Sequence, residues 1–292
     1  MNDFAGDRVA ITEKTCCLRH LAFLKQGTDP AGGNDFTVFI FEIGGKAGAE
    51  AQFLACICEH RCIARATFAE TEVAAGHDMD RTEIAHQLDL PVVSVDYRLA
   101  PEHPFPAAPD DCEAAARWIA SSPAELDREI TGLVITGDSA GGNLTIVTTN
   151  QLVNEPAAVP VVVQAPIYPV ASDLSRHSSL AMFAEGFLLT GAAMAWFTSQ
   201  YGGDASDPRH TPMVGDCSDT PPTVVCTAGL DPLRDSGREY AAHLVQLGTE
   251  TVYLEFPGII HGFTTLRKAI PSGQNDLEAF LDAVKLMVER HR

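Results

Sequence analysis

From residue 91 onward, short apolar segments alternate with segments in which apolar residues recur at helical spacing. The apolar segments lie at 91–97, 133–136, 159–166, 223–227 and 251–256. The helical patterns lie at 110–121, 143–152, 238–247 and 277–290, with an amphipathic helical region at 179–201. Apolar strands that alternate with amphipathic helices are typical of a mostly parallel sheet with helices on both faces. We therefore predict an α/β fold built around such a sheet.

The first quarter of the chain has a weaker pattern. Residues 36–41 read as a strand and are followed by Gly44 and Gly45, whereas 49–75 are rich in Ala, Glu and Cys and lack a clear period. At 292 residues the chain can bury one large core, and α/β folds of this size usually form a single domain. We expect one domain over 1–292, with an atypical N-terminal region at 1–76.

Charge and composition exclude several classes of partner. The net charge of −19 repels phosphate backbones and anionic membranes, so we expect no nucleic-acid partner. No run of about 18 apolar residues is present, and the first residues lack a basic segment followed by an apolar one, so we expect neither a membrane span nor a secretory signal. The eight cysteines are scattered, which is typical of reduced thiols in a cytoplasmic protein.

Residues 137–141 read Gly-Asp-Ser-Ala-Gly, a G-x-S-x-G motif. The motif alone is a weak signal, and its plain interpretation is a Gly-rich turn with an idle serine. Here it lies between the strand 133–136 and a helix that begins near Gly141, and such a sharp turn exposes the serine above the sheet. The helix N-terminus supplies positive potential, and the N–H of Ala140 can bind a developing oxyanion. This placement predicts Ser139 as a nucleophile.

A serine nucleophile needs a base, and the base needs an orienting carboxylate. In a parallel sheet both should follow the C-terminal ends of strands. Asp231 follows the strand 223–227, and His261 comes five residues after the strand 251–256. Considered separately, Asp231 could simply cap a loop, and His261 could be an ordinary surface histidine. Asp235 is an alternative acid, one helical turn farther along, and the alternative bases without comparable placement are His77, His103, His210 and His243.

Five segments carry a resemblance to a known family. They are 93–108 (VSVDYRLAPEHPFPAA), 137–144 (GDSAGGNL), 185–190 (EGFLLT), 231–235 (DPLRD) and 261–263 (HGF). On these segments, residues 77–292 resemble the hormone-sensitive-lipase-like branch of the α/β-hydrolases, which holds bacterial carboxylesterases and acetyl esterases. The chain order Ser139, Asp231, His261 is the order of that fold.

The resemblance implies an α/β-hydrolase fold with a small helical cap, to which 179–201 would contribute together with the acyl pocket. It implies Ser139 as nucleophile, His261 as general base and acid and Asp231 as orienting carboxylate, with no metal and no cofactor. We expect a serine carboxylesterase that hydrolyses small-molecule, short-chain acyl esters through an acyl-enzyme. Two alternative functions stay open: a lactonase or amidase, and an impaired or non-catalytic binder of small ligands. A homodimer is also open.

One family motif is missing. Members of the family carry His-Gly-Gly-Gly after an early strand, and its N–H groups complete the oxyanion hole beside the residue corresponding to Ala140. Counting back, the motif should fall near 65–68, where it is absent. Gly44 and Gly45 follow a strand as required, but about twenty residues too early. Either the chain has an insertion after Gly45, or residues up to about 76 are foreign to the fold, as a frame error would produce.

A second cluster could suggest a metal. Cys56, Cys58, His60 and Cys62 place four potential soft ligands within seven residues. Structural zinc sites usually place two pairs of ligands on separate turns, with a longer spacing between the pairs. We interpret these residues as incidental thiols and an imidazole, with zinc as the alternative.

Overall fold

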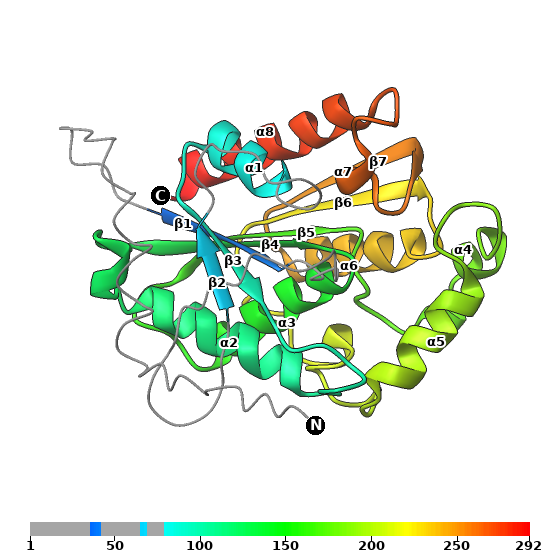
Figure 1. Ribbon diagram of the computed structural model, residues 1–292, viewed down its shortest axis with the longest axis horizontal. Helices are drawn as coiled ribbons and strands as arrows, with labels where there is room; N and C mark the ends of the chain where they lie inside the picture. Colours follow the sequence, from blue (N-terminus) through cyan, green and yellow to red (C-terminus); the bar gives the residue numbers. More distant parts are fainter. Residues whose placement is uncertain (1–35, 42–64, 69–78) are drawn as a thin grey trace, which may run out of the picture.

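In the part of the chain that the structure describes, seven strands form one sheet in the order β2-β3-β1-β4-β5-β6-β7 (Figure 1). The computed structural model describes residues 36–41, 65–68 and 79–292. β2 runs antiparallel to β3, and all other neighbouring strands are parallel, which confirms the predicted sheet. The strands are β1 Phe36–Phe41, β2 Arg65–Phe68, β3 Val92–Asp96, β4 Gly132–Asp138, β5 Val161–Ile167, β6 Thr223–Leu230 and β7 Thr251–Ile260.

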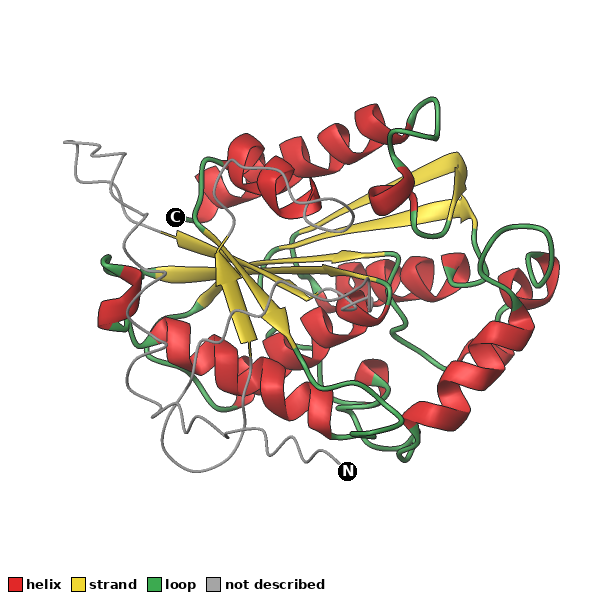
Figure 2. Ribbon diagram, in the orientation of Figure 1, coloured by secondary structure: helices red, strands yellow, loops and turns green. Residues whose placement is uncertain are grey.

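Helices cover both faces of this sheet (Figure 2). The α-helices of the described residues are α1 Met79–Leu88, α2 Ala107–Ala120, α3 Ala140–Asn154, α4 Ser178–Met182, α5 Gly191–Tyr201, α6 Arg234–Leu247, α7 Phe263–Leu266 and α8 Gly273–His291. Short 3-10 turns lie at Ala124–Leu126, Leu174–Arg176 and Pro212–Val214. No helix among the described residues has both the length and the apolar character needed to cross a bilayer.

The alternation of side chains along the central strands explains the two helical layers. Val134 of β4 belongs to an apolar cluster with residues of α1 and α8, whereas its neighbours Leu133 and Ile135 belong to a cluster with residues of α2 and α3. Successive side chains of a strand point to opposite faces, so an unbroken apolar strand needs cover on both sides. The continuous apolar segments at 91–97, 133–136, 159–166 and 223–227 are therefore the inner strands, whereas 251–256 belongs to β7 at the edge of the described sheet.

The region 179–201 differs from the single amphipathic helical region that the sequence predicts. α4 and α5 are separate helices, and α5 has no buried residue. Between them, Gly186 has φ +86° and Leu188 has φ +73°, a left-handed conformation that ends a right-handed helix. α5 then begins at Thr190, whose side chain accepts a hydrogen bond from the N–H of Ala193 at 3.1 Å.

Three further elements depart from the sequence-based expectation. α1 and β2 lie in segments to which the sequence assigns no structure, and β2 occupies the positions 65–68 at which the missing family motif is expected. The predicted strand at 36–41 is confirmed as β1, which lies between β3 and β4. The strand predicted at 251–256 continues to Ile260, because its pairing with β6 resumes after an irregularity.

Candidate active site

Ser139 lies at the sharp turn between β4 and α3. Its φ of +58° and ψ of −115° are rare for a residue with a side chain, and its backbone N–H donates to the carbonyl of Ile167 at 3.0 Å. In the first turn of α3, the N–H of Asn143 donates to the carbonyl of Ser139 at 3.1 Å. This geometry holds the hydroxyl at the C-terminal edge of the sheet, in front of the first turn of α3.

Gly142, the residue directly after the motif, is explained by crowding at this turn. A Cβ atom on Gly142 would lie 2.8 Å from the carbonyl oxygen of Ile167 and 3.0 Å from the Cα atom of Pro169. Real Cβ atoms do not approach backbone atoms so closely, so any larger residue would force α3 away from β5. Glycine at this position therefore lets the helix start close to the sheet and keeps the turn sharp.

Asp231 and His261 follow the ends of two neighbouring strands. Ala228 pairs with Phe256, and the next printed partners along the strands are Leu230 and Ile260. Between these pairs β6 advances by two residues and β7 by four, so β7 bulges outward in this stretch. The bulge brings His261 level with Asp231. His261 consequently follows its strand directly, rather than five residues beyond it as the sequence suggests.

Hydrogen bonds connect the three predicted site residues, from Ser139 to His261 and from His261 to Asp231. His261 Nε2 lies 2.8 Å from Ser139 Oγ, and His261 Nδ1 lies 2.7 Å from Asp231 Oδ2. A carboxylate can only accept, so Nδ1 carries the hydrogen and Nε2 is free to accept from the serine hydroxyl. The other carboxylate oxygen of Asp231 accepts from the N–H of Leu233 at 2.8 Å.

The exposed fraction increases from Asp231 through His261 to Ser139. Asp231 has no exposed surface, His261 is 9% exposed and Ser139 is half-buried. The carboxylate therefore acts on the imidazole in a medium that screens charge weakly, while the serine hydroxyl stays within reach of a ligand. The arrangement can remove a proton from the serine and pass it on to a leaving group.

Asp235, the alternative acid, has a different set of partners. Its Oδ2 accepts from the Ser178 hydroxyl at 3.1 Å and from the Ser179 N–H at 2.9 Å, and its Oδ1 accepts from Arg234 Nε at 2.9 Å and from Arg238 Nη1 at 3.2 Å. Burial opposes its ionisation, but the hydrogen bonds from Arg234, Ser179 and Ser178 outweigh that effect and lower the pKa of Asp235 to about 2. Asp235 thus ties α4 to the start of α6 instead of contacting His261.

None of the alternative bases that the structure describes is hydrogen-bonded to Ser139. His103 is in an exposed loop, His243 is on α6, and His210 packs its ring 5.6 Å from that of Phe105. His77 lies outside the described residues. The oxyanion-hole residues Gly44 and Gly45, which the sequence singles out, and the cluster of three cysteines with His60 also lie outside them. Among the residues that the structure does describe, no group of three His, Cys, Asp or Glu side chains could hold a metal ion.

One residue beside the site, Tyr168, carries no motif that would predict a role. The ring of Tyr168, the residue after β5, lies 4.6 Å from the imidazole of His261, centroid to centroid. Its only sequence signal is its position directly after a buried strand, which puts it at the same edge of the sheet as Asp231 and His261.

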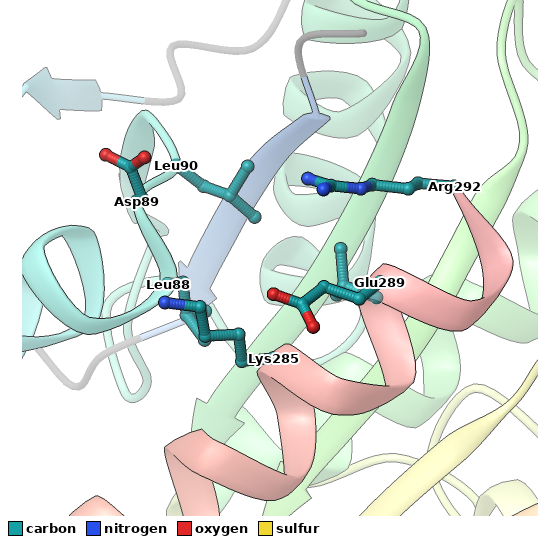
Figure 3. Close-up of a pocket in the computed structure, with 7 residues that line it drawn as sticks. Leu88, Asp89, Leu90, Lys285, Glu289 and Arg292 are labelled. Carbon is teal, nitrogen blue, oxygen red and sulfur yellow. The ribbon is translucent and has the colours of Figure 1, made fainter. Parts of the chain in front are cut away.

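A pocket of about 210 Å³ lies at the opposite edge of the sheet (Figure 3). It is formed by the turn between α1 and β3 and by the last turns of α8, with charged groups of both signs from Asp89, Lys285, Glu289 and Arg292. Since β3 begins at Val92, this pocket is next to the N-terminal end of a strand. It is separate from the site at Ser139.

Comparison with known proteins identifies the family of the chain. The profile of the family with the α/β-hydrolase fold matches residues 70–265, which include Ser139, Asp231 and His261. The chain belongs to the α/β-hydrolase family. This α/β hydrolase is 33% identical over 213 residues to an ethyl acetate hydrolase from Pseudomonas putida, with 72% of this chain and 67% of the relative covered. It is 37% identical over 208 residues to the carboxylic ester hydrolase LipN of Mycobacterium tuberculosis, with 67% and 55% covered.

A solved structure has a similar fold. An esterase from Pyrobaculum calidifontis superposes with a TM-score of 0.71 at 31% identity, covering 88% of this α/β hydrolase and 78% of the esterase. The names of these relatives are those of carboxylic ester hydrolases, which confirms the resemblance inferred from the sequence. The α/β hydrolase spans about two thirds and about half the length of the two curated relatives, so the activity of the whole protein is a proposal.

Proposed function

We propose that this α/β hydrolase cleaves short-chain carboxylic esters by nucleophilic catalysis. Ser139 is the nucleophile, His261 the general base and acid, and Asp231 the carboxylate that orients the imidazole. The observation that carries the proposal is the series of two hydrogen bonds, 2.8 Å from Ser139 Oγ to His261 Nε2 and 2.7 Å from His261 Nδ1 to Asp231 Oδ2. The ester-hydrolase names of the relatives support the reaction class.

The reaction proceeds in two halves. Ser139 Oγ attacks the ester carbonyl carbon while His261 Nε2 takes the hydroxyl proton, and the carbonyl oxygen becomes an oxyanion. The tetrahedral intermediate collapses, the alcohol leaves with the proton from His261, and an acyl group remains on Ser139. Water then attacks the acyl-enzyme with His261 again as base, and the carboxylic acid departs. Asp231 keeps the Nδ1–H in place and stabilises the imidazolium in both halves.

The oxyanion needs donors that are in place before the reaction. Ala140 is the first residue of α3, so its N–H has no partner of its own within the helix and lies at the positive end of the helix dipole. We assign the first donor to this N–H. Gly44 and Gly45 remain the proposed source of the second, because β1 ends at Phe41 and pairs in parallel with β4, with Phe41 opposite Gly137.

The preference for short acyl chains rests on a relative. The Pseudomonas putida protein is named for ethyl acetate, an ester with an acetyl group. A Cβ atom on Gly262 would lie 3.9 Å from Leu188 Cδ2, so the segment before α5 lies close to the residue after His261. The left-handed φ of Leu188 fixes how that side chain is presented.

The test is steady-state turnover of p-nitrophenyl acetate, butyrate and palmitate by the wild type and by Ser139→Ala. We expect turnover of the acetate and butyrate, little of the palmitate, and none above background for the variant. Ser172→Ala is a matched control, because the Ser172 hydroxyl also lies 2.8 Å from a histidine, but there Ser172 and Glu239 both contact Nε2 of His177 instead of the two opposite ring nitrogens.

Three outcomes would contradict the proposal. Equal turnover above background by the wild type and Ser139→Ala would exclude Ser139 as the nucleophile, whereas turnover by neither protein would leave a ligand-binding protein as the better account. Hydrolysis of the palmitate alone would exclude the short-chain preference. Ser172→Ala should keep the wild-type kcat. The comparison separates the loss of the Ser139 hydroxyl from the loss of any serine hydroxyl next to a histidine.

A further inference from the structure

Tyr168 is fully buried and packs against the candidate base. It follows Ile167, the last residue of β5, with a φ of +34°, and its backbone N–H donates to the carbonyl of Cys226 at 2.8 Å. Its ring centroid lies 4.6 Å from that of His261, with the ring planes inclined at 55°. On another side the ring meets Phe263 in an edge-to-face contact at 5.6 Å. The imidazole of His261 thus has an aromatic wall whose own position is fixed by packing.

The hydroxyl of Tyr168 connects two other segments. It donates to Asp138 Oδ2 at 2.9 Å, and it lies 2.7 Å from Thr264 Oγ1. Since the carboxylate only accepts, the phenolic hydrogen goes to Asp138, and the Thr264 hydroxyl donates to the phenolic oxygen. Asp138 is the residue before Ser139, and Thr264 is three residues after His261. One hydroxyl therefore bridges the segment that carries the nucleophile and the segment that carries the base.

We propose that Tyr168 is a positioning residue for His261. Its ring is the main constraint that stops the imidazole from turning away from Ser139, and its hydroxyl makes a smaller contribution by keeping the two segments at their separation. The proposal rests on the function proposed above, because it assigns Tyr168 a role only if His261 takes the proton of Ser139. Tyr168 has no exposed surface, so it acts through His261 and not by contact with the ester.

The physical need for such a wall follows from how His261 is held. Asp231 holds the Nδ1 end of the ring throughout, whereas the contact of Nε2 with Ser139 Oγ is lost once that oxygen attacks the ester, which leaves the ring free to rotate about the Nδ1 contact. A displacement of about 1 Å at a reacting group can lower turnover by about 10²-fold. The face of the tyrosine ring also attracts the positive charge that His261 gains during attack. Both effects act on the chemical step and leave ester binding unchanged.

The test compares variants that separate the ring from the hydroxyl. Tyr168→Phe keeps the ring, and Tyr168→Leu removes it. Tyr240→Leu is the matched control, because Tyr240 is also fully buried with a bonded hydroxyl but packs between α6 and the sheet, far along the chain from the base. Each variant is assayed with p-nitrophenyl acetate below its melting temperature, and the low-field proton resonance of the His261–Asp231 hydrogen bond is recorded by NMR.

For Tyr168→Leu we expect kcat to fall by about 10- to 100-fold with KM changed less than about twofold, together with loss of the low-field resonance. Tyr168→Phe should recover kcat to within about fivefold of the wild type and keep the resonance. Tyr240→Leu should lose stability but keep kcat and the resonance. If Tyr168→Leu does not fold, Tyr168→Met gives the same comparison with more of the volume filled.

The proposal is overturned if the ring-free variant keeps kcat within twofold of Tyr240→Leu, or if Tyr168→Phe is as slow as Tyr168→Leu. Its failure is distinct from failure of the proposed function. If the role of Tyr168 fails but the proposed function holds, Ser139→Ala is inactive while the ring-free variant is as active as its control or as slow as Tyr168→Phe. If the proposed function fails, Ser139→Ala itself turns over like the wild type.

Discussion

Leu230 of β6 and Ile260 of β7 are register partners, and the residues that follow them in the chain are Asp231 and His261. The alignment depends on the bulge between Phe256 and Ile260, because a regular ladder from Ala228 and Phe256 would pair Leu230 with Gly258. His261 would then lie farther along than Asp231. The 2.7 Å contact between imidazole and carboxylate is therefore a consequence of strand register.

Gly229 makes room for this bulge, and its replacement tests the register account. A Cβ atom there would lie 2.5 Å from the carbonyl oxygen of Pro257. We expect Gly229→Ala to lower the free energy of unfolding by about 1–3 kcal/mol and to reduce kcat by at least tenfold, because β7 must move where it aligns His261. Stability is measured by urea unfolding and kcat with p-nitrophenyl acetate.

Gly248→Ala is the control for that variant. Gly248 has φ +87° at the end of α6 and open space around it, so alanine there costs about 1 kcal/mol of backbone strain and should leave kcat unchanged. Equal kcat values for Gly229→Ala and Gly248→Ala would show that the bulge does not align the site.

The two aspartates of the Asp-Pro-Leu-Arg-Asp segment should separate sharply on mutation. Asp231→Asn puts an amide opposite His261 Nδ1 and favours the wrong tautomer, so kcat should fall by about 10⁴-fold. Asp235→Asn should keep kcat within about tenfold, because Asp235 contacts α4 and two arginines instead of the imidazole. The opposite order, measured by kcat at neutral pH, would identify Asp235 as the acid.

The ionisation of Asp235 should also make the free energy of unfolding depend on pH in the acid range. Its pKa is about 2 in the folded chain and near 4 in an unfolded one, so its anchor to α4 stabilises the protein fully above pH 4 and loses its effect as the pH falls toward 2. In urea unfolding, Asp235→Asn should be less stable than the wild type at pH 5, and the difference should shrink between pH 4 and pH 2. A difference that stays constant over this range would rule out ionised Asp235 as the anchor.

Much of the site was predictable because strand ends are visible in the sequence. Ser139, Asp231 and His261 each follow an apolar segment, and the C-terminal ends of parallel strands meet at one edge of a sheet. The exact length of β7 was not predictable, since a bulge is set by pairing with another strand and not by local pattern.

Other features depend on contacts that a linear pattern does not contain. Tyr168 reads as the end of a buried strand, and only the packing of three strand ends brings its ring to His261. The segment at 179–201 is apolar enough to read as one helix, but the left-handed residues Gly186 and Leu188 divide it. Among the described strands, β2 pairs with β3 alone, and its four residues are too short a run to stand out in the sequence.

The most direct test of the central claim is to locate a covalent adduct. A p-nitrophenyl alkylphosphonate transfers its phosphonyl group to an activated serine oxygen and releases p-nitrophenolate, and peptide mass spectrometry then identifies the modified residue. We predict one phosphonyl group per chain, on Ser139, with labelling slowed at least 10³-fold in His261→Ala because the hydroxyl loses its base. Labelling of another residue, or equally fast labelling of Ser139 without His261, would contradict the account.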